Sequence, residues 1–329
     1  MALEARDQQH AEQIEAGISG RKRGHAFEKR LAEELVGLQT PTSAPWKVEN
    51  AHLVWDSPAL GLFRYIASAE RWASASVEKT YWLGGLATSG EGDTLLAADG
   101  RKVTGSKSDI VIDVRVGRSL HRIGVSVKTC FNATPTNAQL YCSTASAFCE
   151  LLRQNGIPVS SRAEDALRMF CGDPGYRPMD QGIGKKTGRA ASDERWFWEE
   201  LKEDGRLEWE RLLQNRHADV FSVLLKNAYP NDPIPPTYVM HVRQKPESWE
   251  RSPLAIYAIS ELVALSVRYQ GFSTRPYQVK KGRFKGDPAT HSAPRFGIVQ
   301  FQPLGNTQNR NQLQFNLQAS YFTKLPYGE

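Results

Sequence analysis

The sequence predicts an α/β or α+β fold in which a central mixed β-sheet is flanked by helices and a β-rich part follows at the C-terminal end. This prediction rests on periodicity. Apolar residues recur at helical spacing over 24–39, strand patterns flank a short charged turn within 109–129, and apolar and polar residues alternate along 268–325. Helical and strand patterns mixed in this way are typical of a layered fold in which a sheet packs against helices.

The composition is that of a globular protein. A chain of 329 residues with 40% hydrophobic and 24% charged residues is long enough for one large domain or two modest ones. Its formal net charge of +6 is compatible with nucleic acid as a partner without requiring one. No apolar run approaches the roughly 18–20 residues that span a membrane. Because the polar N-terminus also lacks a secretory signal pattern, we expect a cytoplasmic protein without a membrane partner.

The cysteines and histidines argue against disulfides and zinc. No two of the four cysteines form a C-x-x-C pair, and none of the seven histidines has ligand spacing to them. Reduced thiols are therefore expected, and the pair Cys142 and Cys149 is expected to be buried on one helix face and not to be a redox pair.

The first half of the chain predicts these elements in order. Phe27, Leu31, Leu35 and Leu38 predict a helix over 24–39 that stops near Gly37. The mixture of aromatic residues and prolines over 41–66 indicates loops and short strands. The elements that follow are a helix over 67–83, a strand over 94–98 with a turn at Asp99-Gly100, and two strands joined by a turn at Gly117.

The second half continues with a loop through Asn137, a helix to Arg153 that stops at Asn155-Gly156, and a long loop over 157–193. Two or three amphipathic helices are expected over 192–227. The remaining elements are a strand over 237–243, a buried helix over 254–267 and antiparallel strands in the tail.

Polar side chains gather on the paired strands. Asp109, Val111 and Asp113 share one face of the first strand, and Ser126 and Lys128 share one face of the second. Neighbouring strands of this kind bring a carboxylate, which suits Mg²⁺, and a lysine, which can help to activate a water, to one end of a sheet. The alternative interpretation is a surface hairpin whose polar face is solvated.

A second carboxylate comes from the first helix. Glu28 lies beside the apolar stripe, one turn from Leu31, and can lean toward the sheet. The alternative is that Glu28 pairs with a neighbouring base in solvent, as helical glutamates usually do.

Glu28 in a first helix, Asp109 at the start of a strand and Lys128 at the end of the next strand resemble the PD-(D/E)XK nuclease superfamily. The stretch GVSVKTCFNATPTNAQLYCSTASAF resembles type II restriction endonucleases more specifically. The resemblance covers residues 24–40 and 100–150 and implies a restriction-endonuclease-like core. It implies that Glu28, Asp109, Ser126 and Lys128 are catalytic.

The resemblance further implies that Mg²⁺ is held by Asp109, Glu28 and the carbonyl oxygen of Val127, and that Lys128 activates the attacking water. The superfamily usually has an acid two residues before the lysine, where this chain has Ser126. The compensating carboxylate is then expected from Glu28, Asp113 or Glu150.

The candidate DNA-contacting residues lie in two places. The segment 268–295 carries seven basic residues against one acid, interleaved with aromatic residues, and its alternative interpretation is a solvated hairpin. The asparagine-containing loop after Lys128 is the second place. The residues expected at DNA are Asn137, Gln139, Arg275, Lys280, Lys281, Arg283 and Lys285.

Two other motifs are set aside. The GIGKKTGR stretch over 182–189 lacks the Walker spacing and a preceding strand, so no nucleotide cofactor is expected. The Trp-rich stretch over 195–213 is interpreted as core and dimer packing, and no histidine is placed for a catalytic triad.

Together these patterns predict a nuclease core over 20–250 and a β-rich, DNA-contacting part over 251–329 packed on it. The expected function is a Mg²⁺-dependent, sequence-specific double-strand DNA endonuclease, of the type II restriction kind, in a prokaryotic cytoplasm. A homodimer is expected because cutting both strands of a palindrome needs two sites related by a two-fold axis. The alternatives are another nuclease of the superfamily, for repair, nicking or resolving, or a DNA-binding module with a degenerate core.

Overall fold

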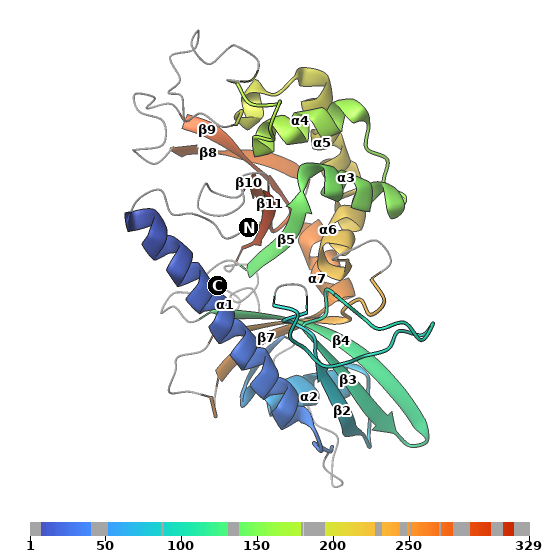
Figure 1. Ribbon diagram of the computed structural model, residues 1–329. Coiled ribbons are helices and arrows are strands. Elements are labelled where there is room, and N and C mark those ends of the chain that lie inside the picture. The colour runs from blue at the N-terminus through green and yellow to red at the C-terminus, as the bar shows by residue number, and fades with distance from the viewer. Residues whose placement is uncertain are drawn as a thin grey trace. The chain divides into compact units, whose positions relative to one another are not determined.

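The computed structural model describes residues 8–40, 52–86, 89–130, 138–178, 180, 195–227, 232–243, 249–250, 252–269, 271–278, 290–303 and 312–318 (Figure 1). The chain forms two compact units, each built from separate segments. The first unit combines residues 16–138, 225–262 and 318–329. The second unit combines residues 1–15, 139–224 and 263–317. The units therefore interleave along the sequence, whereas the expected nuclease core over 20–250 and C-terminal part over 251–329 are consecutive. Their assignment as core and DNA-contacting part stays a prediction.

The first unit contains a six-stranded mixed sheet in the order β1-β7-β6-β4-β3-β2. Only the β4–β6 pair is parallel, and the other pairs are antiparallel. The hairpin β3–β4 turns at Gly117, whose φ of 59° favours glycine. The strands are β1 (Leu53–Asp56), β2 (Ser76–Trp82), β3 (Ile110–Val116), β4 (Ser119–Cys130), β6 (Tyr238–Arg243) and β7 (Ser252–Ala258).

Helices α1 (Gln8–Leu35) and α2 (Pro58–Ala69) supply the apolar residues that cover one face of this sheet. Phe27, Leu31 and Leu35 of α1 are buried against strand residues such as Ile112 and Val127. This burial confirms the predicted apolar stripe, and it fixes the rotation of α1 about its axis. The side chain of Glu28 is buried with them.

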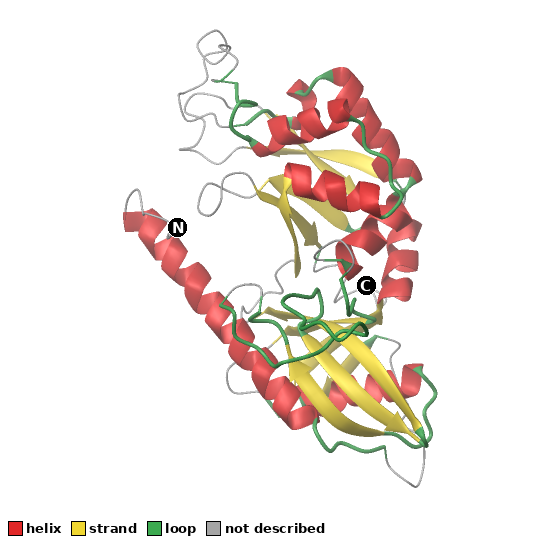
Figure 2. Cartoon of the chain, turned by 45° about the vertical axis from the view of Figure 1, so that its right-hand side comes forward, coloured by secondary structure: helices red, strands yellow, loops and turns green. Residues whose placement is uncertain are grey.

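The second unit contains a five-stranded sheet in the order β5-β11-β10-β9-β8. Aromatic side chains fill the space between this sheet and its helices, as Phe148 against Phe315 and Phe170 against Phe301 illustrate. Figure 2 shows the helices gathered beside the strands of the unit. Helix α6 ends, and helix α7 begins, with a few residues that belong to the first unit. The elements are β5 (Ala138–Thr144), α3 (Ala145–Gln154), α4 (Ser161–Cys171), α5 (Glu203–Asn215), α6 (His217–Lys226), α7 (Ile259–Arg268), β8 (Phe272–Gln278), β9 (Thr290–Phe296), β10 (Val299–Pro303) and β11 (Gln312–Leu317).

The predicted fold class, a central mixed sheet flanked by helices with a β-rich C-terminal part, is confirmed. The β3–β4 hairpin, the strand over 237–243 and the antiparallel tail strands are also confirmed. Trp198 and Trp209 are buried core residues, as predicted. Cys130, Cys149 and Cys171 are buried free thiols. Cys142 lies on β5 and Cys149 on α3, so the prediction that the two share one helix face is wrong.

Two predictions for the first unit are wrong. Of the loops and short strands expected over 41–66, the strand β1 is present, but the residues from Pro58 on form the helix α2. Pro58 occupies the first turn of α2, where no amide donor is needed. The helix expected over 67–83 is the end of α2 and the strand β2. Small residues continue the helical pattern past Ala69, but Arg71 with φ 57° ends it, and the β-branched and aromatic residues that follow favour a strand.

Further predictions are wrong beyond Lys128. The segment expected as a helix up to Arg153 begins with strand β5, in which Gln139 is exposed between buried Ala138 and Leu140. The helix expected over 254–267 begins with strand β7, because a short buried apolar run looks alike in both states. The loop expected over 157–193 contains α4, which Ser160 caps by accepting the Ala163 amide and Gly172 ends at φ 74°.

Two smaller expectations also need correction. The strand expected over 94–98 is a single bridge between Leu96 and Lys102, although the turn at Asp99-Gly100 is present. The Trp-rich stretch becomes α-helical only from Glu203, after a short 3-10 helix at Trp198–Glu200.

Candidate active site

The site lies where β3 begins and β4 approaches its end. Asp109 directly precedes β3, and its main chain is held on two sides. Its amide donates to the Val125 carbonyl at 2.9 Å, and its own carbonyl accepts the amides of Leu83 and Gly84 at 2.8 and 3.1 Å. These bonds fix the Asp109 backbone between β4 and the turn that follows β2.

The Asp109 carboxylate is oriented through one of its oxygens. Oδ2 accepts the Val127 amide at 2.6 Å, the Ser126 hydroxyl at 3.1 Å and the Lys128 ammonium at 3.5 Å. Among the described residues, none donates a hydrogen bond to Oδ1. The side chain is 20% exposed, so Asp109 presents a fixed carboxylate to the outside of the sheet.

Ser126 takes the place where the resemblance expects an acid. Its side chain is buried and donates to Asp109, so it stabilises the carboxylate and does not add a second one. A carboxylate within hydrogen-bond distance of Asp109 would instead repel it.

Lys128 is tied to the same end of the strand pair. Its Nζ lies 3.2 Å from the Val127 carbonyl oxygen and 3.5 Å from Asp109 Oδ2, and the side chain is 23% exposed. The ammonium is therefore positioned beside the aspartate and still reaches solvent. The Val127 carbonyl has two lone pairs, so accepting from Lys128 leaves one for another partner.

Glu28 brings a second carboxylate toward the site from α1. Its side chain is 8% exposed, and Trp82 Nε1 donates to its Oε2 at 3.2 Å. Burial, followed by repulsion from Asp109, raises the pKa of Glu28 to about 8, while Trp82 and Lys128 act in the opposite direction. Glu28 therefore lies near enough to both Asp109 and Lys128 for their charges to affect its protonation.

Gly84 leaves the room that Glu28 occupies. A Cβ built on Gly84 would overlap Glu28 Oε2 and would also approach Trp82 Nε1 to 3.2 Å. Neither Trp82 nor Gly84 was among the predicted site residues, because 67–83 was expected to be a helix that ends at a glycine-rich break. A glycine close to the end of an aromatic strand, two residues after Trp82, is a signal for close approach of another group.

The donor atoms at this site suit a hard cation. Among the described residues, no group of three or more His, Cys, Asp or Glu side chains is placed to hold a metal. Mg²⁺, however, is commonly held by one or two carboxylates together with waters. Asp109, Glu28 and the Val127 carbonyl supply oxygen donors of this type, and the two carboxylates would repel each other less with a cation between them.

The other two candidate carboxylates are placed differently. Asp113 is buried on β3 and accepts two hydrogen bonds from Arg122, at 2.7 and 2.8 Å. It lies four residues along the strand from Asp109, which corresponds to about 13 Å. Glu150 belongs to α3 in the second unit, where it accepts from Gln154.

The expected DNA-contacting residues are only partly described. Gln139 on β5 and Arg275 on β8 are exposed residues of the five-stranded sheet. Asn137, Lys280, Lys281, Arg283 and Lys285 lie outside the described residues, as does the 182–189 stretch. A role for these residues at DNA stays a prediction.

A further buried residue that the sequence analysis did not select lies beside the site. His241 on β6 is paired in register with Lys128 on the parallel neighbour β4. Its side chain is 2% exposed. Its position follows from the β4–β6 pairing, which no local pattern reveals.

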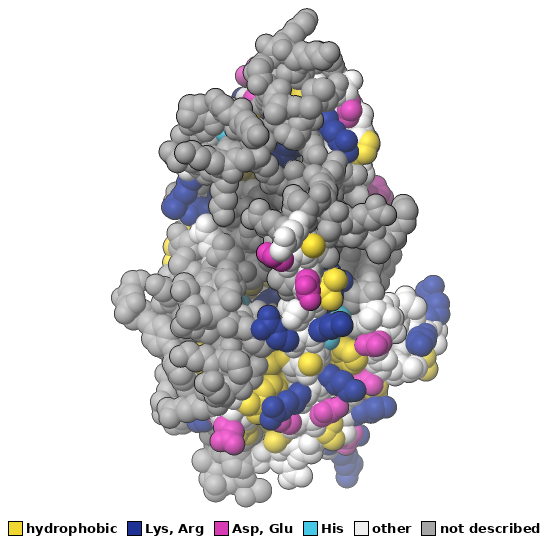
Figure 3. Space-filling view, turned by 60° about the vertical axis from the view of Figure 1, so that its left-hand side comes forward, with side chains coloured by type: hydrophobic (Ala, Val, Ile, Leu, Met, Phe, Trp, Pro, Cys, Tyr) yellow, Lys and Arg dark blue, Asp and Glu magenta, His cyan; other side chains and the backbone are white. Residues whose placement is uncertain are grey.

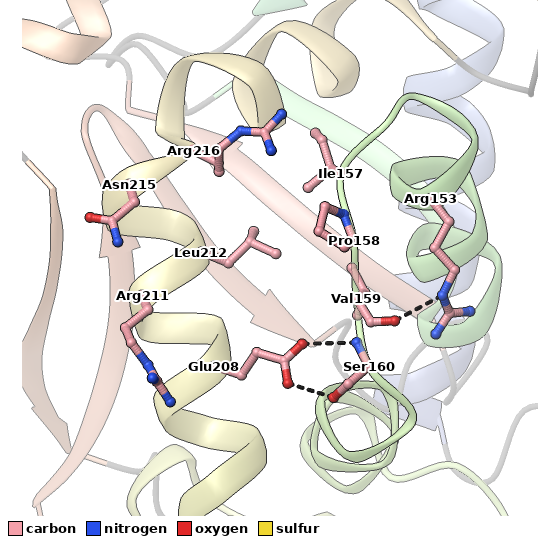
Figure 4. Close-up of a pocket in the computed structure, with 10 residues that line it drawn as sticks. All are labelled: Arg153, Ile157, Pro158, Val159, Ser160, Glu208, Arg211, Leu212, Asn215 and Arg216. Atoms are coloured by element: carbon pink, nitrogen blue, oxygen red, sulfur yellow. Dashed lines mark hydrogen bonds between the residues drawn. The ribbon is translucent and has the colours of Figure 1, made fainter.

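The second unit contains an open groove of about 710 Å³ between the 157–160 segment and α5 (Figure 4). Glu208 accepts the amide and hydroxyl of Ser160, and Arg153 Nε donates to the Val159 carbonyl at 3.0 Å. These polar groups hold the segment to the neighbouring helices.

Comparison with known proteins gives a weak structural similarity. No protein-family model matches the chain, and no curated protein matches it significantly. Among solved structures, the chain is similar to restriction endonuclease MspI in complex with its cognate DNA, with a TM-score of 0.41, 11% identity, and coverage of 78% of this chain and 76% of that chain. Over the parts of the chain that the structure describes, no helix is both long and apolar enough for a membrane span. A similarity of this size leaves the function to be argued from the residues themselves.

Proposed function

We propose that this protein is a Mg²⁺-dependent, sequence-specific endonuclease that hydrolyses phosphodiester bonds in double-stranded DNA, in the manner of a type II restriction enzyme. The observation that carries the proposal is the Asp109 carboxylate, which Ser126 and Val127 hold and which lies 3.5 Å from the Lys128 ammonium, with Glu28 buried beside them. A fixed carboxylate next to an ammonium and a second acid are the groups needed to bind a cation and to activate a water.

In this proposal each residue has one role. Asp109, Glu28 and the Val127 carbonyl would hold Mg²⁺. The bound ion would neutralise negative charge that develops on the attacked phosphate and on the leaving oxygen. Lys128 would lower the pKa of the attacking water and orient it. Ser126 would keep Asp109 in place through the 3.1 Å hydrogen bond. No covalent intermediate with the protein is required.

A homodimer and a prokaryotic cytoplasmic location belong to the same proposal. Two identical active sites related by a two-fold axis would cut the two strands of a palindromic target. Sedimentation of the protein with and without a cleavable duplex tests the dimer, because a monomer in both states would contradict it.

The test uses long mixed-sequence DNA incubated with the protein in Mg²⁺ and in EDTA. Discrete fragments are expected in Mg²⁺ alone, and Lys128→Ala is expected to abolish them. Lys102→Ala provides the control, because it removes the same charge from an exposed position outside the site. A smear of random fragments would instead favour a repair, nicking or resolving nuclease.

A second candidate is a DNA-binding module whose catalysis has been lost. The observation that favours it is Ser126, which supplies a hydroxyl where the superfamily usually has an acid. Binding of DNA without cleavage in Mg²⁺ or Mn²⁺ would support this candidate and refute the endonuclease.

A further inference from the structure

Helix α1 extends beyond the part that packs on the sheet. Its buried stripe runs through Phe27, Leu31 and Leu35, whereas residues 21–23 are exposed. The helix continues N-terminally to Gln8, so these exposed residues are held in helical geometry. The exposed residues 21–23 therefore lie about two turns N-terminal of Glu28 on the same continuous helix.

This exposed turn carries three consecutive bases, Arg21, Lys22 and Arg23. Residues 16–27 contain no aspartate or glutamate. Within the described residues, neither Arg21 nor Lys22 forms an ion pair, although many bases elsewhere do, as Arg30 with Glu34 shows. Figure 3 shows Lys and Arg side chains interspersed with Asp and Glu on one face of the molecule. Exposed charges contribute little to stability even when they are paired, so stability does not account for this run.

Helical geometry places Arg21 on the face of α1 that bears Glu28. Seven residues at 100° each amount to 700°, which leaves an offset of about 20° around the axis, and the rise is about 10 Å. Gly24 and His25 lie between them on nearly the same face. A Cβ on Gly24 would lie 3.8 Å from Thr129 Oγ1, and the His25 ring centroid lies 6.0 Å from that of Trp82. The face therefore runs from Glu28 past the end of β4 to Arg21.

We propose that Arg21 binds a DNA backbone phosphate a few nucleotides from the one that is cut, so that the exposed turn of α1 serves as a phosphate-contacting surface. This inference rests on the proposed endonuclease function. Phosphates of one strand follow at about 3.4 Å along the duplex axis, so a 10 Å offset corresponds to roughly three nucleotides. The guanidinium suits this ligand because it can donate two parallel hydrogen bonds to phosphate oxygens.

The test measures DNA affinity as a function of salt in a Lys128→Ala background, which prevents cleavage. Each phosphate contact contributes about 0.9 to the slope of log K against log salt. Arg21→Gln is expected to lower the slope by about this amount, and Arg21→Lys is expected to retain it. Arg118→Gln is the matched control, because Arg118 is exposed in the β3–β4 turn, at the opposite end of β4 from Lys128. It is expected to leave the slope unchanged.

In the cleavage-competent protein, Arg21→Gln is expected to raise KM and to change kcat little, because the contact forms equally in the ground and transition states. If the Lys128→Ala parent binds DNA and Arg21→Gln shows an undiminished slope, this inference is overturned while the proposed function stands. If the wild type neither binds nor cuts DNA, the proposed function is overturned and this inference with it. Melting curves should be superimposable for the Arg21 variants and their parent, because the side chain is exposed.

Discussion

Replacing Glu28 by glutamine should make the metal-free protein more stable at alkaline pH. In the folded protein the pKa of Glu28 is raised from an ordinary 4.5 to about 8, chiefly by burial. Folding therefore favours the protonated acid, and the free energy of unfolding of the wild type should fall as the pH rises from 4.5 toward 8. The amide side chain of the Glu28→Gln variant would be neutral at every pH and would still accept from Trp82, so the variant should lose this dependence.

The size of the effect follows from the shift. One pKa unit corresponds to about 1.4 kcal/mol. The shift of the pKa of Glu28, which is 8% exposed, from 4.5 to about 8 therefore sets an upper bound on the order of 5 kcal/mol on the difference in free energy of unfolding between the two proteins. Below pH 4.5 the two proteins should differ little, because Glu28 is then protonated in both the folded and the unfolded state. Above pH 8 the full difference should be present.

The assay is chemical unfolding in EDTA at several pH values between 4.5 and 9, with the wild type and Glu28→Gln side by side. Glu33→Gln is the control, because Glu33 is an exposed glutamate of the same helix. Saturating Mg²⁺ should diminish the difference at high pH, because a bound cation stabilises the ionised acid. Equal pH dependence in the wild type and Glu28→Gln would refute the reasoning.

Three further substitutions separate the parts of the site. Gly84→Ala should push the Glu28 carboxylate aside, lower stability by about 1–3 kcal/mol in denaturant titration and reduce DNA cleavage. Ser126→Ala should cost about 1 kcal/mol and lower kcat, because the aspartate at the start of β3 loses a buried hydrogen bond; an unchanged kcat would argue against a positioning role. Arg122→Gln should leave Asp113 without its charged partner and cost about 1–3 kcal/mol, but cleavage measured well below the unfolding transition should persist.

The hairpin that carries Asp109 and Lys128 was predictable because its signals are local. Two apolar runs and a short charged turn with a glycine define β3 and β4, and the pairing then brings the two ends together without further information. Glu28 was predictable as a helix residue beside an apolar stripe. Its burial and its contact with Trp82 were not, because they depend on how α1 lies on a sheet whose strands come from distant parts of the chain.

The errors have a common physical origin. Strands β5 and β7 are followed at once by helices α3 and α7, so the sequence pattern predicts a single helix for each strand and the helix that follows it. Over a short apolar run such as β7, periodicity alone does not separate a buried strand from a buried helix. The helix α4 was hidden by a polar segment, although Ser160 and Gly172 mark its two ends. The arrangement of the units was equally out of reach, because segments far apart in sequence build each of them.

The continuity of α1 makes the spacing along it more constrained than the identity of its exposed residues. Inserting or deleting a single residue between Arg21 and Glu28 would turn everything N-terminal of that point by about 100° and move it by about 1.5 Å. An insertion of seven residues would preserve the direction to within about 20° but move the basic turn about 10 Å farther from Glu28. We therefore expect sequences that share this helix to keep a base at the position of Arg21 and to accept changes of length only before it.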